Sequence, residues 1–335
     1  MEEILLTCII PVYNTEHYVL RCLQSIENQH LQSSDYEVLV VDDGSTDGSR
    51  AVVERYAQEH HQVKLLVQDN AGVSAARNLA LDHARGRFVM FVDSDDYLCD
   101  DAVPVLLQRV MDENLDVLSF NYCCKDVQGH ELPHTRDDNY ATTAVTTGFD
   151  FLNSHSMTPY IWRFIIRREF LEEGQWRFDP SLIVCEDGAL IARFLLNAGR
   201  MAHDDALAYC YVKRADSAMH NTDQDHLRRR ICSQVDSAAL IDAAARQFEA
   251  STGNTVPASV YGVRNVYLYF SMTKALTSGL VDEILQRIRK AGLYPFPCVG
   301  PEADYHGKKW EIIHWLMMRP RLWSLLSKVY RMIKK

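Results

Sequence analysis

The sequence has no uninterrupted apolar run near the ~18 residues that a membrane-spanning helix needs, although 47% of its 335 residues are hydrophobic. Its first residues, Met1-Glu2-Glu3, are acidic, whereas a secretory signal peptide begins with a basic region and a long apolar core. The nine cysteines include no C-x-x-C pair and show no regular spacing, which argues against a disulfide framework and against a zinc site. We therefore expect a cytoplasmic protein without a membrane-spanning segment.

Charge is distributed unevenly along the chain. The net charge is −10, so nothing suggests a nucleic-acid partner, yet residues 308–335 carry +7 and the remainder carries −17. Within 321–335 apolar residues recur at helical spacing with basic residues off that stripe. Trp310, Trp315 and Trp323 lie along the longer segment 310–335. This pattern predicts peripheral contact of residues 310–335 with the inner face of the cytoplasmic membrane. A terminal helix docked on the acidic body is the alternative.

Continuously apolar runs alternate with helical patterns over the first 120 residues. Such alternation predicts a Rossmann-like α/β fold, in which a mostly parallel sheet is flanked by helices. The expected strands are 4–10, 36–41, 63–67, 88–92 and 116–120, and the expected helices are 17–28, 47–60, 73–84 and 101–113. Residues 223–306 are expected to form a helical C-terminal extension, with helices at 225–250 and 258–277, followed by the basic tail 307–335.

Polar clusters follow three of the expected strands, at 11–14, 42–45 and 93–96. Ligands of open α/β sheets bind beyond the carboxyl ends of the strands, so the three clusters should share one rim. Asp93-Ser94-Asp95-Asp96 offers three carboxylates, and Mg²⁺ is usually held by one or two carboxylates together with substrate phosphates. The cluster therefore indicates a phosphate-bearing substrate. An acidic loop that caps the next helix is the simpler alternative.

The segment 43–54 also resembles a calcium-binding EF-hand loop, which is the non-enzymatic hypothesis. An EF-hand loop follows a helix, whereas residues 36–41 read as a strand, and no second copy exists. Two other enzyme classes fit less well. A sugar nucleotidyltransferase would need a glycine-rich, basic phosphate loop after the first strand, and an aspartyl phosphatase would carry paired aspartates there; the sequence has Pro-Val-Tyr-Asn.

Four motifs together resemble the inverting family 2 glycosyltransferases with the GT-A fold. They are Ile10-Pro11-Val12-Tyr13-Asn14, Val41-Asp42-Asp43-Gly44-Ser45-Thr46-Asp47, Gly72-Val73-Ser74-Ala75-Ala76-Arg77-Asn78 and Phe91-Val92-Asp93-Ser94-Asp95-Asp96, the last containing a D-x-D motif. The resemblance is strong over residues 4–120, moderate to about 220 and absent from the C-terminal third. It implies transfer of a sugar from a nucleotide diphosphate-sugar, usually a UDP-hexose or UDP-N-acetylhexosamine, to an acceptor hydroxyl with inversion at the anomeric carbon.

The resemblance also implies roles for individual residues. It assigns the nucleotide-sugar donor to Pro11, Tyr13, Asp43, Arg77, Asp93 and Ser94. It assigns a divalent metal, Mn²⁺ or Mg²⁺, to Asp95, with Asp96 left as an acid at the start of the next helix. A cation at this position would stabilise the negative charge that develops on the leaving diphosphate.

An inverting displacement needs a base that takes the proton of the acceptor hydroxyl. The family supplies it from an acidic pair at a helix start, which Cys185-Glu186-Asp187-Gly188 resembles. We expect Asp187 to be the base, with Glu186 as the alternate or the orienting neighbour. The alternative is an acidic helix N-terminus that interacts with the helix dipole, an effect of about 0.3–1 kcal/mol.

The expected organisation is a nucleotide-sugar-binding half at 1–120 and an acceptor half with the base at 121–222, followed by the helical extension and the tail. Two features of the acceptor half stay open. Trp162 belongs either to the acceptor site or to the core. Lys213, Arg214 or His220 would close over the diphosphate, or they form a solvated basic turn.

With a membrane-bound tail, the acceptor is expected to be a lipid-linked saccharide in surface-polysaccharide assembly. The remaining alternative is an inactive, membrane-associated protein that binds a nucleotide-sugar or calcium.

Overall fold

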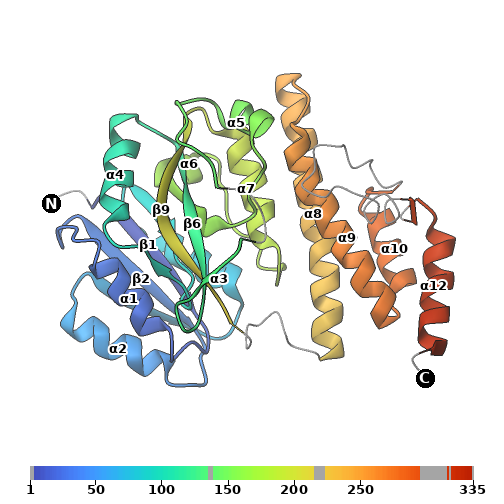
Figure 1. The fold of residues 1–335 in the computed structure, drawn as a ribbon, viewed down its shortest axis with the longest axis horizontal. Helices are drawn as coiled ribbons and strands as arrows, with labels where there is room; N and C mark the ends of the chain where they lie inside the picture. The colour runs from blue at the N-terminus through green and yellow to red at the C-terminus, as the bar shows by residue number, and fades with distance from the viewer. Residues whose placement is uncertain (1–3, 135–138, 215–222, 295–314, 317, 334–335) are drawn as a thin grey trace. The chain divides into compact units, whose positions relative to one another are not determined.

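The computed structural model describes residues 4–134, 139–214, 223–294, 315–316 and 318–333 (Figure 1). Two compact units divide the chain. The first comprises Met1–Phe151, Tyr160–Pro180 and Ala198–Ser217, and the second comprises Leu152–Pro159, Ser181–Asn197 and Ala218–Lys335. The first unit contains the β-sheet, and the second is built from helices.

The first unit begins with the predicted alternation of strands and helices. Strands β3, β2, β1 and β4 are neighbours in that order and are parallel to one another. Their bounds are β1 Leu6–Val12, β2 Tyr36–Asp43, β3 Val63–Gln68 and β4 Phe88–Phe91. The intervening helices are α1 Val19–Glu27, α2 Ser49–Glu59 and α3 Val73–His83. The predicted Rossmann-like α/β architecture is confirmed.

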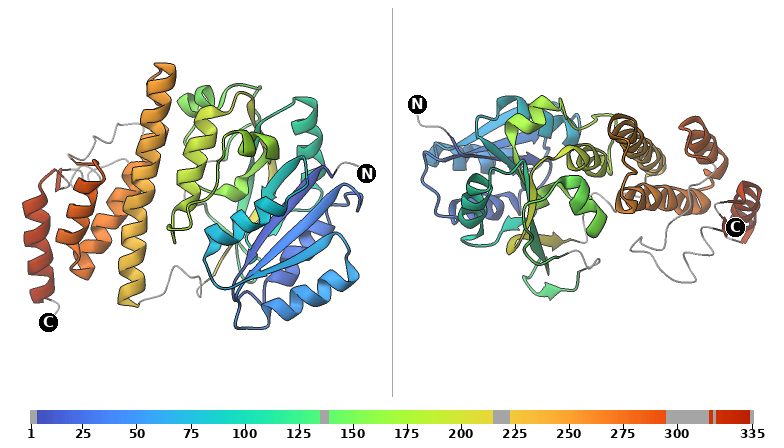
Figure 2. Two further views of the ribbon diagram at one scale, coloured as in Figure 1. Left: turned by 180° about the vertical axis from the view of Figure 1, so that it is seen from behind. Right: turned by 90° about the horizontal axis from the view of Figure 1, so that it is seen from above.

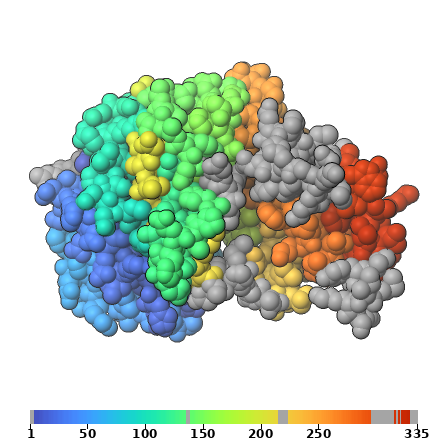
Figure 3. Space-filling model, viewed as in Figure 1, coloured from blue at the N-terminus to red at the C-terminus, as the bar shows by residue number. Residues whose placement is uncertain are grey.

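Beyond β4 the sheet becomes mixed. It continues through β8, β6, β9 and β5, with β7 paired to β6, and only β6 and β9 are parallel among these. The bounds are β5 Tyr97–Leu98, β6 Val117–Asp126, β7 Glu131–Leu132, β8 Phe164–Arg167 and β9 Met201–Lys213. The remaining short helices are α4 Ala102–Asp112, α5 Gly148–Ser154, the 3₁₀ turn η1 Ile161–Arg163 and α6 Arg168–Glu173. A register shift between β6 and β9 accompanies a stretch where β9 reaches the surface (Figure 3).

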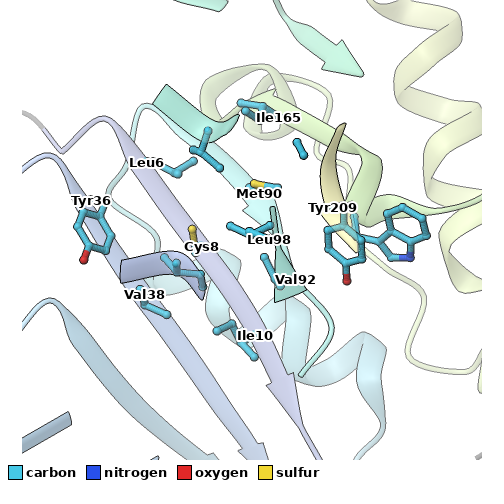
Figure 4. Close-up of a cluster of buried hydrophobic side chains, with 14 of the residues drawn as sticks. Leu6, Cys8, Ile10, Tyr36, Val38, Met90, Val92, Leu98, Ile165 and Tyr209 are labelled. Atoms are coloured by element: carbon cyan, nitrogen blue, oxygen red, sulfur yellow. The ribbon is translucent and has the colours of Figure 1, made fainter. Parts of the chain in front are cut away.

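The core explains why β1 and β2 are mainly apolar. Every residue of both strands is buried, because helices cover both faces of the sheet (Figure 2). Alternate residues of β1, including Cys8 and Ile10, join Val92 and Leu98 in one apolar cluster to which α1, α2 and α4 contribute (Figure 4). Helix α3 contacts β1 and β2 and lies outside that cluster. Packing on both faces of the sheet fixes the positions of the strand ends, where the polar clusters lie.

The second unit consists mainly of long helices. Their bounds are α7 Glu186–Asn197, α8 Gln224–Thr252, α9 Ala258–Ser278, α10 Val281–Lys290 and α12 Pro320–Ile333. The predicted helices at 225–250 and 258–277 are therefore present. Helix α8 starts at Asp223, whose carboxylate accepts a hydrogen bond from the backbone N–H of His226, and it ends at Gly253 in the left-handed conformation. Within the described ranges, none of the helices combines the length and apolarity required to cross a bilayer.

Candidate active site

The loops that follow β1 and β2 are joined by side-chain hydrogen bonds. The Asn14 side-chain oxygen accepts from the backbone N–H of Thr46 at 2.8 Å, and the Asn14 N–H donates to Ser45 Oγ at 3.1 Å. Asn14 has a φ of 54°, a conformation that asparagine tolerates better than most residues. The N–H of Thr15 donates to Ser49 Oγ at 2.7 Å. The two loops therefore form one connected edge of the sheet, as predicted for strand ends that share a rim.

Asp43, at the end of β2, organises the loop that leads into α3. Its carboxylate accepts from Gln68 Nε2 at 2.7 Å and from the backbone N–H groups of Ala71 at 2.7 Å and Gly72 at 2.9 Å. Gly72 has a φ of 90°, which favours glycine at this helix start. Since a carboxylate offers about four acceptor positions, Asp43 has limited capacity left for a ligand.

The same hydrogen bonds exclude the EF-hand hypothesis. Strand β2, and not a helix, precedes the loop. The oxygens of Asp43 and Asp47 accept from protein N–H groups, including those of Glu16 and Ser49 for Asp47. Burial alone would raise the pKa of Asp47, but these hydrogen bonds outweigh it and lower the pKa. The acidic residues of this segment stabilise the loop itself.

Arg77, which is buried, forms an ion pair with Asp93, whose side chain is 30% exposed. Arg77 Nη2 lies 2.9 Å from Asp93 Oδ1, and the Arg77 guanidinium carbon is 5.2 Å from the centre of the Phe178 ring. Ser94 is buried and accepts a hydrogen bond from the Thr15 hydroxyl at 3.1 Å. These contacts bring Arg77 of α3 and Asp93 and Ser94 of the turn after β4, all predicted to bind the nucleotide-sugar, to the rim formed by the β1 and β2 loops.

Asp95 is held by two arginines. Its Oδ2 lies 2.7 Å from Nη2 of Arg214, and Nη2 of Arg21 donates to its backbone carbonyl at 3.2 Å. One quarter of the Asp95 side chain is exposed. Burial and the neighbouring Asp93 raise the pKa of Asp95, while Arg214 opposes that shift. The Arg214 guanidinium also lies 4.7 Å from the centre of the Tyr18 ring. Arg214, which the sequence offered only as one of three candidates, is thus a residue of this site, and His220 lies outside the described residues.

Asp96 differs from the expectation that it caps the following helix. It is 1% exposed, strand β5 follows it, and α4 begins only at Ala102. Its carboxylate accepts from the Tyr209 hydroxyl at 2.8 Å and from the Val212 N–H at 2.7 Å, and the Tyr209 oxygen accepts from the Asp93 N–H at 3.0 Å. Burial and the nearby Asp95 and Asp93 raise the pKa of Asp96 well above its usual range. The helix-capping interpretation is wrong, because Asp96 instead ties the turn to β9.

Three further predicted residues differ in exposure. Pro11 is buried within β1, whereas Tyr13, just beyond the strand, is half exposed at the rim. Trp162 is buried and stacked on Tyr209, with ring centres 4.3 Å apart and planes 11° apart. Of the two interpretations of Trp162, the core residue is the correct one.

The acidic turn fits a cation only in part. Among residues that the structure describes, no cluster of three or more His, Cys, Asp or Glu side chains is arranged to hold a metal ion. Asp96 is buried and accepts from Tyr209 and Val212, whereas Asp93, paired with Arg77, and Asp95, paired with Arg214, are 30% and 25% exposed. One carboxylate suffices for Mg²⁺ when substrate phosphates and water complete the coordination. Asp95 therefore fits a metal that binds together with a nucleotide.

The acidic pair Glu186 and Asp187 lies in the second unit, in the first turn of α7. The chain just before it is held to α8, since the Ser237 hydroxyl donates to the carbonyl of Cys185 at 2.7 Å. Gly188 allows close approach, because a Cβ at this position would overlap the Tyr267 hydroxyl. Both carboxylates are half-buried at a helix N-terminus, where the helix dipole favours negative charge.

A separate groove of about 680 Å³ lies within the second unit. Its charged side chains balance, and four of them pair as Arg228 with Glu283 and Arg287 with Asp236, at 2.8 and 2.5 Å. It is lined by Ser181, Ile183, Asp225, Arg228, Arg229, Cys232, Ser233, Asp236, Glu283 and Arg287. A balanced, internally paired lining does not favour an anionic nucleotide, so the donor site is better placed at the rim of the sheet.

The comparison with known proteins identifies the family of the chain. The model of the family "Glycosyl transferase family 2" matches residues 7–196, and the chain belongs to that family. Its fold is the GT-A fold. A similar protein is an uncharacterized glycosyltransferase, YibD, of Escherichia coli K12, which is 30% identical over 67% of this chain and 64% of its own length.

Staphylococcus aureus TarS, a poly(ribitol-phosphate) beta-N-acetylglucosaminyltransferase, is 31% identical over 62% of this chain and 35% of its own length. The crystal structure of TarS residues 1–349 with UDP-GlcNAc superposes with a TM-score of 0.69 at 22% identity, covering 98% of this chain and 92% of that one. The mannosyltransferase PcManGT of Pyrobaculum calidifontis, in complex with GDP-Man and Mn²⁺, has a TM-score of 0.51 at 17% identity, covering 98% and 87%. The chain spans less than two thirds of the full length of YibD and of TarS.

Proposed function

We propose that this chain transfers a sugar from a UDP-sugar, with inversion, to a hydroxyl group of a lipid-linked saccharide. The observation that carries the proposal is the joined rim of the sheet, where Asp43, the Arg77–Asp93 pair and the Asp95–Arg214 pair lie at the ends of β2 and β4 and beside them. This arrangement supplies hydrogen-bond acceptors for a nucleoside and cationic groups for a diphosphate within one edge of the fold.

The donor side of the mechanism follows from these contacts. Tyr13 is exposed beside buried Pro11 and offers an aromatic face to a base. Arg77 holds the Asp93 carboxylate in one orientation, so that Asp93 can accept from a ribose hydroxyl. Ser94 is fixed by Thr15 and contributes to the same wall. These residues bind and orient the donor, which contributes to catalysis by positioning.

Asp95 would hold Mn²⁺ or Mg²⁺, which supplies electrostatic stabilisation of the leaving diphosphate when it is bound. Arg214 provides a second positive charge at the same carboxylate. A guanidinium matches phosphate oxygens in a bidentate geometry, so Arg214 can exchange its bond to Asp95 for a bond to the diphosphate. This exchange would keep Asp95 and the leaving group both neutralised.

Asp187 is proposed as the base that accepts the proton of the acceptor hydroxyl, with Glu186 beside it. They lie in the first turn of α7, at the end of the helix where the dipole favours negative charge. The bonds from α8 to the preceding residues and the close contact of Gly188 with Tyr267 restrain this turn. A restrained carboxylate is what an in-line displacement requires of its base.

The names of the relatives suggest which donor sugar and which class of acceptor to propose. TarS was crystallised with UDP-GlcNAc and acts on a poly(ribitol-phosphate) acceptor, and a Bacillus spizizenii relative is a poly(ribitol-phosphate) beta-glucosyltransferase. We therefore propose UDP-GlcNAc or UDP-glucose as the donor. A polyol-phosphate polymer is the second acceptor class to test, beside a lipid-linked saccharide.

The test is release of nucleotide across a panel of UDP-, GDP- and TDP-sugars with Mn²⁺ or Mg²⁺ and both acceptor classes. Metal-dependent transfer from a UDP-sugar is expected, with a loss of at least 100-fold in Asp95→Ala and Asp187→Ala. Glu186→Gln is the matched control for Asp187→Asn, because both keep the shape of the side chain. Wild-type-like turnover in Asp187→Asn would reject the base. Donor binding without transfer to any acceptor would favour the inactive nucleotide-sugar-binding alternative.

A further inference from the structure

Helix α12 packs on the second unit by one side only. Trp323 is 2% exposed and Ser327 is equally buried, and the helix contacts α9 and α10. The hydroxyl of Ser324 donates to Asp282 Oδ1 of α10 at 2.5 Å. The Trp323 ring therefore docks the helix on the second unit and is not available for the membrane contact predicted for the tail. Trp310 lies outside the described residues.

The other side of this segment combines exposed apolar and basic side chains. Trp315, Met318 and Leu325 are 49%, 40% and 57% exposed. The guanidinium carbon of Arg319 lies 4.0 Å from the centre of the Trp315 ring, and Arg321 and Lys328 are exposed beside it. The sequence contains no Asp or Glu after Glu311. We call this the α12 surface, and it consists of Trp315, Met318, Arg319, Arg321, Leu325, Leu326 and Lys328.

We propose that the α12 surface binds an anionic lipid bilayer peripherally. Basic groups of an interfacial helix are attracted to an anionic leaflet, and a tryptophan ring prefers the level of the headgroups. The positive charge of residues 308–335 contrasts with the −17 of the remaining chain, so the same bilayer repels the rest of the protein. Attraction confined to one surface would orient the enzyme on the membrane. The inference deepens the proposed function, on which it rests, because a lipid-linked acceptor is presented at a bilayer.

A second copy of the chain is the competing occupant of this surface. Its acidic body would match the basic residues, but it would not provide a continuous apolar phase for the four apolar side chains of the surface. A bilayer interface provides both the negative charge and the apolar phase at one depth. The charge arrangement therefore favours lipid over self-association.

The expected size of the effect follows from the charges. Each basic residue near an anionic leaflet contributes roughly a fivefold factor to partitioning. Removing Arg319, Arg321 and Lys328 from the surface should then weaken binding to anionic vesicles by about 100-fold. Salt should reduce binding of the wild-type protein in the same direction, since the Debye length falls from about 10 Å at 0.1 M to about 3 Å at 1 M.

The test is co-sedimentation of the full chain with vesicles of phosphatidylcholine alone or with one third phosphatidylglycerol. Binding to the anionic vesicles is expected, with a loss of about 100-fold in the triple variant Arg319→Gln, Arg321→Gln, Lys328→Gln. Trp315→Ser with Leu325→Ser should also weaken binding, whereas Val105→Ser, which changes an equally exposed apolar residue of the first unit, should not. Equal binding of all variants, or no binding of the wild type, would overturn the proposal.

Two additional measurements separate the outcomes. Light scattering without lipid detects self-association, and a dimer that the α12 variants dissociate would assign the surface to a second copy. Binding of UDP-sugar to each variant checks that the first unit remains folded and reports on the donor site independently of lipid. Retained donor binding with lost vesicle binding supports the membrane surface, while absence of sugar transfer despite vesicle binding counts against the proposed function alone.

Discussion

Removing Arg214 should make it easier for a divalent cation to bind at Asp95. The Arg214 guanidinium lies 2.7 Å from the Asp95 carboxylate, where it would compete with a metal for that carboxylate. Exposed ion pairs contribute about 0.2–1 kcal/mol, whereas breaking a buried pair costs about 3–5 kcal/mol. Asp95 is one quarter exposed and Arg214 one tenth, so we take about 1.4 kcal/mol for the competition. This corresponds to a tenfold change in affinity.

The assay is titration of Mn²⁺ by electron paramagnetic resonance, which detects the free ion. Without nucleotide, Arg214→Ala should bind Mn²⁺ about tenfold more tightly than the wild type. With UDP present the sign should reverse, because the variant lacks the guanidinium that would move to the diphosphate. Arg21→Ala is the matched control, since Arg21 contacts the backbone carbonyl of Asp95 and leaves its carboxylate unaltered.

The reasoning would be refuted by unchanged Mn²⁺ affinity in Arg214→Ala together with lost binding in Asp95→Ala. That combination would place the metal at Asp95 without competition from Arg214. Unchanged Mn²⁺ binding in Asp95→Ala would instead reject Asp95 as a metal ligand. Either outcome is distinguishable from misfolding by the thermal unfolding temperature of each variant.

Three further predictions concern stability and are measured by urea unfolding. Glu37 is buried, which raises its pKa, but hydrogen bonds from Arg85 and other donors outweigh burial and lower it. Glu37→Gln should cost about 1–3 kcal/mol at pH 7, and the difference should vanish as the pH falls from about 4.3, the unfolded-state pKa, through the lower folded-state pKa. Gly188→Ala should cost about 1–3 kcal/mol through overlap with Tyr267. Tyr209→Phe should cost about 1–3 kcal/mol, since it leaves buried polar groups of the acidic turn unpaired.

Matched controls accompany these substitutions. Glu54→Gln removes an exposed carboxylate whose pair with Arg50 lies on the helix surface, so it should change stability by less than about 0.5 kcal/mol. Tyr211→Phe is the control for Tyr209→Phe, because it also removes a tyrosine hydroxyl, two residues away and on a more exposed ring. Gly188→Ala in a Tyr267→Phe background should cost less than in the wild type, because the overlapping hydroxyl is gone. Additive effects in that cycle would contradict the steric explanation.

The parallel half of the fold was predictable because its signals are local. Apolar runs such as 38–41 mark strands buried on both faces, and the observed β2 extends only two residues beyond the predicted strand 36–41. The antiparallel strands gave weaker signals, since β5 has two residues and β8 has four. Such short strands are defined by partners that lie far away along the chain, and periodicity within a few residues does not reveal those partners.

The amino-acid sequence by itself determined that acidic clusters would meet at one rim, because the carboxyl ends of parallel strands necessarily share an edge. Composition and spacing did not distinguish the three aspartates of the turn, and only the family resemblance gave them different roles. Only the tertiary structure decided that Asp96 is buried by Tyr209, 113 residues away, while Asp95 remains partly exposed against Arg214. The physical reason is that burial and ion pairing depend on side chains from distant segments, and these set which carboxylate is free to exchange its partner.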